Sequence, residues 1–386
     1  MMSPDRLPML NYAVDAHLLA GGQGLNFSHV AEIARGGFRV KLFGRGVDGE
    51  DYQAIPESRL ANFLTRIPVL RRNRHWKVLW QSRHFDRMVA DRLTGGEVFL
   101  GAGGTCLRSF AAAHALGSRR VLDVTTLHVD QFGGYQDREG AKFDVRASWH
   151  KALRDQAREE YRQADLIRIV SHLGARSLVE GGVDPDKIVV VHPPLLSMEE
   201  FPNVVHESDR LRIGIVGMLE PAKGFHYLVE AVQGIRSDDL ELSLWGGTGS
   251  RKIAQYVAKA TSQDPRIKHR TEAIRAVGLE SVFGNMEVLV HPSLSDGFGL
   301  AVAEAMACGI PAIVTSTTGA SDLIEDGVSG FIVPPADAGA IRDRLRFFLD
   351  NPGSLSRMGA AARAAVSQLT LDQSRAAFLP RLHALL

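Results

Sequence analysis

The chain has 386 residues, of which 45% are hydrophobic, and a formal net charge of +1. This length predicts two domains or one very large one, and the apolar content suffices for the cores of both. A balanced charge gives no overall field that would attract nucleic acid. The two cysteines, Cys106 and Cys308, lack metal-ligand spacing. We therefore expect a soluble globular protein in a reducing compartment, without a disulfide scaffold, a metal site or a nucleic-acid partner.

The beginning of the chain carries no targeting pattern. Residues 1–22 lack a charged start followed by an apolar core, and no uninterrupted apolar run approaches the roughly 18 residues that a membrane helix needs. We expect a cytoplasmic protein, which could also touch a membrane from its cytoplasmic side.

The first predicted unit of structure is strand, glycine turn, helix and strand. A short strand from Leu10 leads to Gly21, Gly22 and Gly24, a helical stretch follows, and FRVKLFG is the next strand. This order is typical of the start of a doubly wound parallel sheet. Glycines at a strand end let the backbone approach a ligand closely, so Gly21 and Gly22 are candidate ligand contacts, with a plain loop as the alternative.

Residues 66–92 differ from the rest of the chain in charge. Eight Arg or Lys stand against two Asp, with Trp76, Trp80 and Phe85 interleaved, and the apolar residues after them repeat at helical spacing. Three interpretations compete: an ordinary helix with a solvated charged face, a docking face for anionic lipid, and a nucleic-acid surface. The first two are favoured, because no nucleic-acid-binding motif accompanies the segment.

Two further strands, EVFLGAGG and RRVLDVTTLHVD, each run into a polar loop, where sheets of this kind place their ligands. His128 falls in the second loop. A single histidine is often only structural, but its position after a strand end favours a role at a ligand. Helix and strand units follow, and the aperiodic, acid-rich stretch LLSMEEFPNVVHESDRL is the predicted linker. We therefore expect a first domain over 1–203 and a second over 204–370.

The second domain opens with a buried strand, a loop and a helix in LRIGIVGMLEPAKGFHYLVEAV. Its loop carries Gly217, Met218, Lys223 and Gly224. Another strand and glycine loop follow in LELSLWGGTGSRK.

The stretch HPSLSDGFGLAVAEAMACGIPAIV combines two acids, a glycine turn and a helix start. A buried strand ends at Pro292, the loop SLSDGFG contains Asp296, and a helix begins at Leu300 and carries Glu304 about one turn above its start. A strand, a glycine turn and a helix N-terminus make a site for an anion such as phosphate. Acids beside it accept hydrogen bonds from hydroxyls, so the combination suits a nucleotide sugar. The alternative is that Asp296 caps the helix and Glu304 is a solvated acid.

The phrase PSLSDGFGLAVAEAMACGIPA resembles the acidic motif of family 4 retaining glycosyltransferases, which have the GT-B fold. The family pattern is Glu, seven residues, Glu. Asp296 stands in the first position here and Glu304 in the second, with the spacing kept. The resemblance spans nearly the whole chain: it is strong from Gly214 to Asp337, moderate from Arg158 to Pro194 and weak before that.

The resemblance implies two Rossmann-like doubly wound parallel-sheet domains that face a cleft, with a last helix, 371–386, that returns to the first domain. It implies that Asp296 contacts the donor sugar, that Glu304 contacts the ribose, and that Lys223 holds the donor phosphates. The residues expected to be catalytic are His128, which would approach the transferred sugar, Lys223 and Asp296. The expected donor-binding residues are Gly21, Gly22, Gly217, Lys223, Gly224, Gly297, Phe298, Gly299, Leu300 and Glu304.

The chain departs from the family pattern at two of these positions. Met218 stands where the family's G-R-x-x-x-x-K-G has Arg, which removes a bidentate phosphate donor. Arg251 and Lys252, in the next glycine loop, are candidate substitutes. Asp296 is one methylene shorter than the family's Glu, which affects the contact with the sugar.

The activity implied by the resemblance is retaining transfer of a sugar from a nucleotide diphosphate to a saccharide, lipid or other small acceptor, in glycan or glycoconjugate biosynthesis. Lys223 and the amides at Gly299 and Leu300 would stabilise the leaving phosphates, so no cofactor or divalent metal is expected. One alternative is a GT-B epimerase or phosphorylase. Another is a GT-B protein that binds nucleotide sugar without turnover, which Met218 and Asp296 favour.

Overall fold

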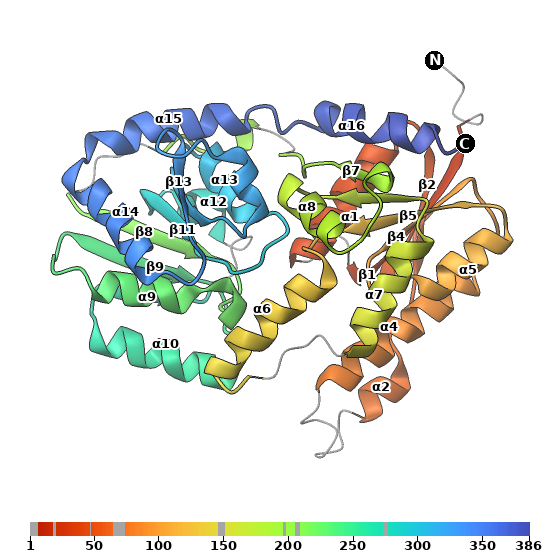
Figure 1. Ribbon diagram of the computed structural model, residues 1–386, viewed down its shortest axis with the longest axis horizontal. Helices are drawn as coiled ribbons and strands as arrows, with labels where there is room; N and C mark the ends of the chain where they lie inside the picture. Colours follow the sequence, from red (N-terminus) through yellow and green to blue (C-terminus); the bar gives the residue numbers. More distant parts are fainter. Residues whose placement is uncertain are drawn as a thin grey trace. The chain divides into compact units, whose positions relative to one another are not determined.

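The computed structural model describes residues 7–17, 21–46, 48–64, 74–145, 151–195, 198–204, 209–272 and 277–386. The chain divides into two compact units (Figure 1). Unit 1 consists of Met1–Gly133, Ala147–Pro194 and Leu371–Leu386, and unit 2 consists of Gly134–Arg146 and Leu195–Thr370.

This division differs from the predicted boundary at residue 203 in two places. Residues 195–203 group with unit 2, and so does the excursion 134–146 from the first half of the chain. The excursion belongs there because Tyr135 and Phe143 pack against the hydrophobic core of unit 2. Its sequence is polar and carries no signal of a domain crossing.

Unit 1 is built on a seven-stranded sheet in the order β3-β2-β1-β4-β5-β6-β7, and all of its strand pairs are parallel. Because both faces of the sheet are covered, its central strands β4, β5 and β6 are largely buried. The strands are β1 (Met9–His17), β2 (Arg39–Arg45), β3 (Tyr52–Ala54), β4 (Val98–Ala102), β5 (Arg119–Val124), β6 (Leu166–Ile169) and β7 (Ile188–Val190).

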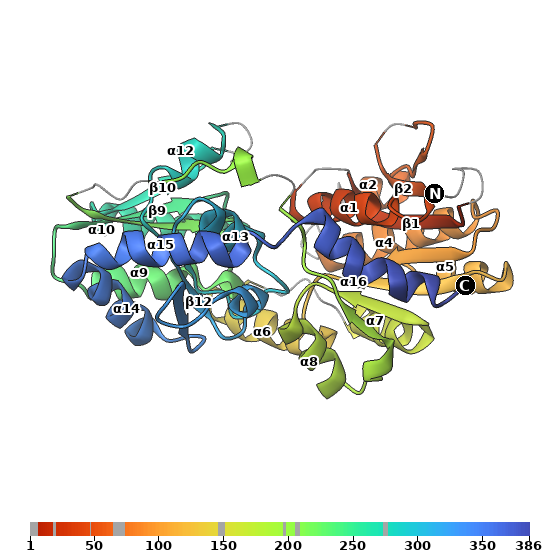
Figure 2. The ribbon, with the colours of Figure 1, turned by 90° about the horizontal axis from the view of Figure 1, so that it is seen from above.

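The helices of unit 1 cover both faces of this sheet. Side chains from α1 and α16 form the core on one face, and side chains from α4, α5, α7 and α8 form the core on the other. Figure 2 shows α16 lying beside α1. The helices are α1 (Gly21–Ala34), α2 (Arg59–Leu64), α4 (Arg74–Ala90), α5 (Leu107–Ala115), α6 (Val129–Lys142), α7 (Lys151–Gln163), α8 (His172–Glu180) and α16 (Leu371–His383), with α6 continuing into unit 2.

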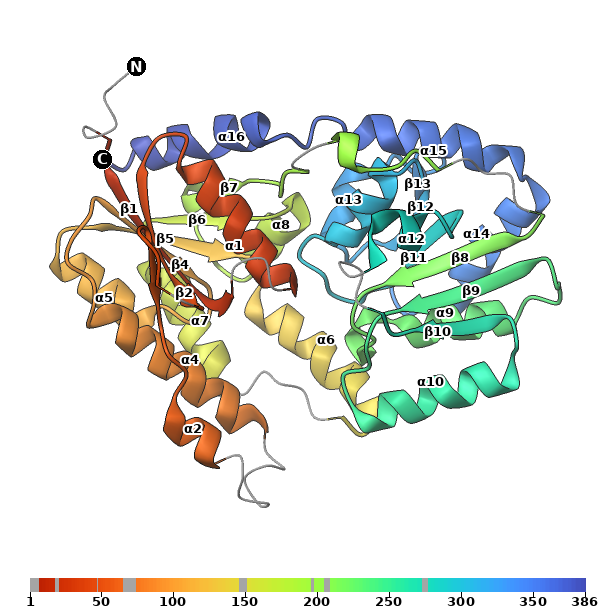
Figure 3. The same ribbon diagram turned by 180° about the vertical axis from the view of Figure 1, so that it is seen from behind.

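Unit 2 contains a six-stranded parallel sheet in the order β10-β9-β8-β11-β12-β13 (Figure 3). Its strands are β8 (Leu211–Val216), β9 (Leu240–Trp245), β10 (Ile267–Arg270), β11 (Val288–His291), β12 (Ala312–Thr315) and β13 (Gly330–Val333). Its other helices are α9 (Phe225–Gln233), α10 (Arg251–Gln263), α12 (Leu279–Phe283), α13 (Leu300–Ala307), α14 (Ala338–Asp350) and α15 (Gly353–Val366). Two doubly wound parallel sheets confirm the predicted fold class.

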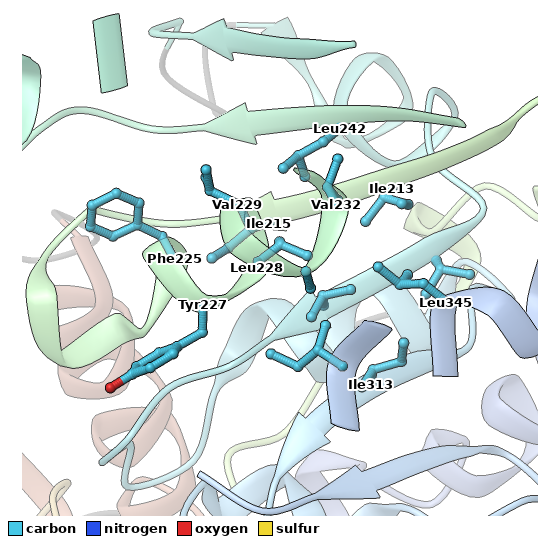
Figure 4. Close-up of a cluster of buried hydrophobic side chains, with 14 of the residues drawn as sticks. Ile213, Ile215, Phe225, Tyr227, Leu228, Val229, Val232, Leu242, Ile313 and Leu345 are labelled. Atoms are coloured by element: carbon cyan, nitrogen blue, oxygen red, sulfur yellow. The ribbon is translucent and has the colours of Figure 1, made fainter. Parts of the chain in front are cut away.

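The core of unit 2 is apolar and fully buried. Figure 4 shows Ile213 and Ile215 of β8 among side chains of α9, such as Leu228 and Val232, with Leu345 of α14 nearby. Burying a Leu or Ile side chain contributes about 1.5 to 3 kcal/mol. This core therefore fixes β8 and α9, and with them the short loop between the two.

The strand order of unit 2 reverses between β8 and β11, and in doubly wound sheets ligands bind at the carboxyl ends of the strands at such a point. The loops after these two strands interlock. Leu294 N donates to Ala222 O at 2.8 Å. Gly224 has a φ of +66°, and a Cβ at this position would lie 2.0 Å from Pro292 O, so only glycine fits.

No helix within the described ranges is long and apolar enough to span a membrane.

The loop after β4 in unit 1 is held by a buried carboxyl. Glu160 of α7 accepts hydrogen bonds from Gly104 N at 2.5 Å and from Cys106 N at 2.9 Å. Burial raises the pKa of Glu160 to about 7, although the amide donors act in the opposite direction. The folded chain therefore keeps this proton to a higher pH than the unfolded chain does.

We predict that Glu160 makes the protein less stable as the pH rises from 4.5 to 7. Because the folded state binds the proton more tightly, the unfolding free energy should fall by about 3 kcal/mol over this window. Denaturant unfolding at a series of pH values measures the effect. The variant Glu160→Gln cannot titrate and should lack this part of the slope. Parallel slopes in wild type and variant would contradict the prediction.

Candidate functional site

Three side chains of the two interlocked loops in unit 2 meet at one carboxylate oxygen. Lys223 ends the turn η4 (Pro221–Lys223), and its Nζ forms an ion pair with Asp296 Oδ2. His291, the last residue of β11, places Nε2 2.9 Å from the same oxygen. Asp296 and His291 are largely shielded from solvent, whereas the Lys223 side chain is 34% exposed. The structure thus brings together two of the three predicted catalytic residues, Lys223 and Asp296, and adds His291.

The charge of Asp296 is fixed by these contacts. Burial opposes ionisation, but the positive charge of Lys223 and the contact with His291 outweigh it and hold the pKa of Asp296 well below its usual range. Asp296 is therefore an ionised group that only accepts hydrogen bonds.

The loop that carries Asp296 is also fixed by its backbone. Asp296 N donates to Thr317 O at 3.2 Å, and Gly319 N donates to Asp296 O at 2.9 Å. Ala320 N donates to Phe298 O at 2.5 Å in the same loop. These bonds attach the acidic loop to the loop after β12, so the carboxylate is preorganised rather than free to move.

Helix α13 begins beside this carboxylate. Gly299 precedes the helix with a φ of +90°, and the helix has no side-chain cap. A Cβ on Gly299 would lie 3.2 Å from Thr318 Cγ2 and 3.5 Å from His291 Nε2. Leu300 is the first helical residue and Glu304 lies half-buried one turn later, while Gly297 and Phe298 are buried in the preceding loop. The amides of this N-terminus suit a phosphate, and the acids on either side suit hydroxyls.

The loop after β8 carries fewer cationic side chains than the G-R-x-x-x-x-K-G pattern that it resembles. Gly217 follows β8, with a φ of +132° and open space where a Cβ would be. Met218 is 50% exposed beside it. Of the two candidate substitutes for the missing arginine, Lys252 forms an ion pair with Asp144, and Arg251 is an exposed first residue of α10. Lys223 is thus the predicted cation that the structure places against the acidic loop.

His128, the third predicted catalytic residue, belongs to unit 1 and is only 5% exposed. Its Nδ1 lies 3.7 Å from Asp130 Oδ2, and its ring packs 5.2 Å from that of Tyr161. A Cβ on Gly181 would lie 2.4 Å from the ring. Burial lowers the pKa of His128, which favours a neutral ring. These contacts fit a structural role, and a role of His128 at the transferred sugar stays a prediction.

Gly21 and Gly22 were expected in a glycine turn, but the structure begins α1 at Gly21, so both lie in its first turn. The predicted turn is thus the start of the helix, and contact of Gly21 and Gly22 with a ligand stays a prediction. Asn26 of α1 is tied into a buried network: its Nδ2 donates to Asp123 Oδ2 at 2.9 Å, and Arg168 Nη1 donates to Asn26 Oδ1 at 3.0 Å.

Sequence reasoning missed His291 as a site residue. The only available signal was its position at the end of a buried strand, immediately before the acidic loop. Its Nδ1 is buried without a hydrogen-bond partner among the described residues, so Nε2 makes the polar contact of the ring.

Part of the chain is similar in sequence to known glycosyltransferases. Residues 197–365 match the family model "Glycosyl transferases group 1". The D-inositol 3-phosphate glycosyltransferase of Streptomyces scabiei is 30% identical over 246 residues, which are 56% of this chain and 54% of that protein. The capsular polysaccharide biosynthesis glycosyltransferase CapM of Staphylococcus aureus is 30% identical over 159 residues, 39% of this chain and 40% of that one. The chain spans about half the length of the curated relatives it matches first.

Solved structures resemble the whole chain. HepE of Anabaena, crystallised with UDP and glucose, has a TM-score of 0.71 and 16% identity, and the match covers 98% of this chain and 100% of that one. Sucrose-phosphate synthase of Thermosynechococcus elongatus has a TM-score of 0.70 and 19% identity, with 98% of each chain covered. Together with the two parallel sheets, these likenesses establish that the chain has the two-domain, Rossmann-like GT-B fold.

Proposed function

We propose that this protein is a retaining glycosyltransferase that moves a sugar from a nucleotide-diphosphate donor to a saccharide, lipid or other small acceptor in glycan biosynthesis. The observation that carries the proposal is the meeting of Lys223 and the ionised Asp296 beside the uncapped N-terminus of α13. The group 1 model covers this region, and the matched relatives are named as glycosyltransferases. HepE was crystallised with UDP, which supports a nucleotide-sugar donor.

The proposed division of roles follows from charge. Asp296 is ionised and accepts hydrogen bonds, so we assign it to hydroxyls of the donor sugar. Glu304, on the first turns of α13, is assigned to the ribose. Lys223 and the amides at Gly299 and Leu300 are assigned to the two phosphates, where negative charge develops as the nucleotide departs.

The ion pair between Lys223 and Asp296 has a consequence for donor binding. Diphosphate must share Lys223 with Asp296 or draw it away, and His291 then remains as the partner of the carboxylate. The proposal assigns the leaving-group charge to this lysine and the helix amides, without a cofactor or a divalent metal. The leaving phosphate would help to deprotonate the acceptor in a front-face substitution.

A second candidate function is binding of a nucleotide sugar without turnover. Met218 in the arginine position, and Lys252 engaged by Asp144, leave fewer cations for the phosphates than the family pattern provides. An epimerase has less support, because the acidic motif resembles that of transferases. A phosphorylase has less support, because no lysine is identified in the sequence as a pyridoxal-binding residue.

Lys223→Ala should lower turnover of the donor by about a hundredfold or more, the scale on which one charge-stabilising group acts. A screen of nucleotide sugars by thermal shift first identifies the donor, and release of labelled sugar then measures turnover. The exposed Lys259 of α10 offers a matched control, since Lys259→Ala removes the same charge away from the site. If the turnover of the Lys223 variant stays within a few-fold of wild type, the leaving group is stabilised by other residues. Donor binding by wild type without any turnover would favour the second candidate.

Substitution of the two acids should affect different ligands in a binding assay. Glu304→Ala should weaken binding of the free nucleoside diphosphate by roughly 1.5 to 3 kcal/mol, the value of a charge-assisted hydrogen bond. Asp296→Ala should weaken binding of the intact donor and spare the free nucleotide. Isothermal titration of both ligands into both variants provides the comparison, and equal losses of nucleotide affinity would refute this division of roles.

We further propose that the basic, aromatic segment 66–92 docks unit 1 on an anionic membrane surface on its cytoplasmic side. Residues 65–73 lie outside the described residues, but the predicted helix is present as α4. Leu79 and Phe85 are buried in it, whereas Val78 and Trp80 are 47% and 39% exposed. Phe63 of the neighbouring α2 is exposed as well. The charge excess of this segment supports an anionic partner, because each Lys or Arg near such a surface contributes on the order of 1 kcal/mol.

Wild type should therefore sediment with vesicles that contain anionic lipid at low salt and be released at high salt. Replacing Phe63 and Trp80 by Ser should reduce binding at low salt. Leu116, an exposed apolar residue after α5, provides the control substitution Leu116→Ser. If wild type ignores anionic vesicles at low salt, the segment is an ordinary solvated surface.

A further inference from the structure

Residues 134–146, the docked segment, belong to unit 2 although the chain before and after them belongs to unit 1. The segment comprises most of α6 and the turn that follows. Phe143 packs with its ring 6.0 Å from that of Phe225 and 5.4 Å from that of Tyr256. Unit 2 therefore includes a segment from the first half of the chain.

One acid of the docked segment is buried at the start of α9. Glu139 is 4% exposed, and the Tyr227 hydroxyl donates to its Oε2 at 3.2 Å. His226 Nε2 lies 3.2 Å from the same oxygen, and Lys142 Nζ lies 2.9 Å from Oε1. Lys142 also donates to the Tyr227 hydroxyl. The Glu139 carboxylate thus contacts both His226 and Tyr227 in the first turn of α9.

The first turn of α9 directly follows the loop after β8, residues 217–224, which carries Lys223 and is here called the phosphate loop because of its proposed role. Lys223 and Gly224 precede Phe225, the first residue of the helix, and no side chain caps the helix from its own loop. A carboxylate near a helix N-terminus is favourable, because the helix dipole is positive there. Burial lowers the pKa of His226 to about 4, so this ring is neutral near pH 7 and Lys142 supplies the positive charge that faces Glu139.

We propose that Glu139 is a positioning residue for Lys223: by fixing the first turn of α9, it holds the phosphate loop in the orientation that binds the donor diphosphate. The inference rests on the proposed function and assigns a part of the donor site to a residue outside the C-terminal half of the chain. Glu139 has no contact with the donor in this account and acts only through α9.

A purely structural role of Glu139 predicts a different effect of substitution on nucleotide affinity. The same segment is attached to unit 2 a second time, where Asp144 forms an exposed ion pair with Lys252 of α10. If Glu139 served only as an anchor, breaking either attachment would lower stability and leave nucleotide affinity alone. Asp144 has a φ of +48°, a conformation that Asn tolerates, so Asp144→Asn is a matched control that removes one carboxylate charge from the segment.

The test is isothermal titration of UDP, GDP and ADP into the full-length chain and its variants. For the nucleotide that wild type binds, Glu139→Gln should raise the dissociation constant about tenfold, whereas Asp144→Asn, which releases Lys252, should not raise it. In a Lys223→Ala background, Glu139→Gln should add less than a further twofold, because the residue through which it acts is gone. This lack of additivity is what an anchor would not produce.

The other outcomes overturn the inference, and they show whether the proposed function fails with it. Equal effects of Glu139→Gln in both backgrounds, or no effect on affinity in wild type, would leave Glu139 as an anchor while the proposed function stands. If wild type binds none of the three nucleotides, the proposed function fails and this inference fails with it. Should Glu139→Gln not fold, Tyr227→Phe removes the hydroxyl that contacts Glu139 and should raise the dissociation constant about threefold, again only while Lys223 is present.

Discussion

The backbone of Gly224 packs directly against the carbonyl of Pro292, and the candidate site depends on this contact. It joins the loop after β8 to the loop after β11 at the point where the strand order of unit 2 reverses. Any side chain on residue 224 would separate the loops and thereby remove Lys223 from Asp296. The packing of two loops, rather than the chemistry of either one, brings the opposite charges together.

This arrangement places an ion pair where we propose that the donor diphosphate binds. A shielded carboxylate is costly unless it is paired, and Asp296 is paired with Lys223 and contacted by His291. Under the proposed function, a diphosphate would offer Lys223 a second anionic partner, and His291 would remain in contact with the carboxylate. In that proposal, the contact of His291 with Asp296 would let one lysine serve two anions.

Much of this could be predicted from the sequence, because the relevant signals are local. Apolar runs gave the strands, and the spacing of Asp296 and Glu304 around a glycine turn indicated a loop followed by a helix. The remaining features depend on contacts between distant residues. No pattern shows that the ring of His291 reaches Asp296, that Lys252 is engaged by Asp144, or that α1 starts at Gly21. The docking of 134–146 on unit 2 rests on Phe143 and Glu139, whose partners lie more than eighty residues later in the chain.

A crystal structure of the full-length chain with a bound nucleoside diphosphate would test the central claim most directly. Our account predicts phosphate oxygens within about 3 Å of Lys223 Nζ and of the first amides of α13, with the ribose at Glu304 and with His291 still contacting Asp296. A diphosphate bound away from α13, with Lys223 still paired only to Asp296, would contradict it.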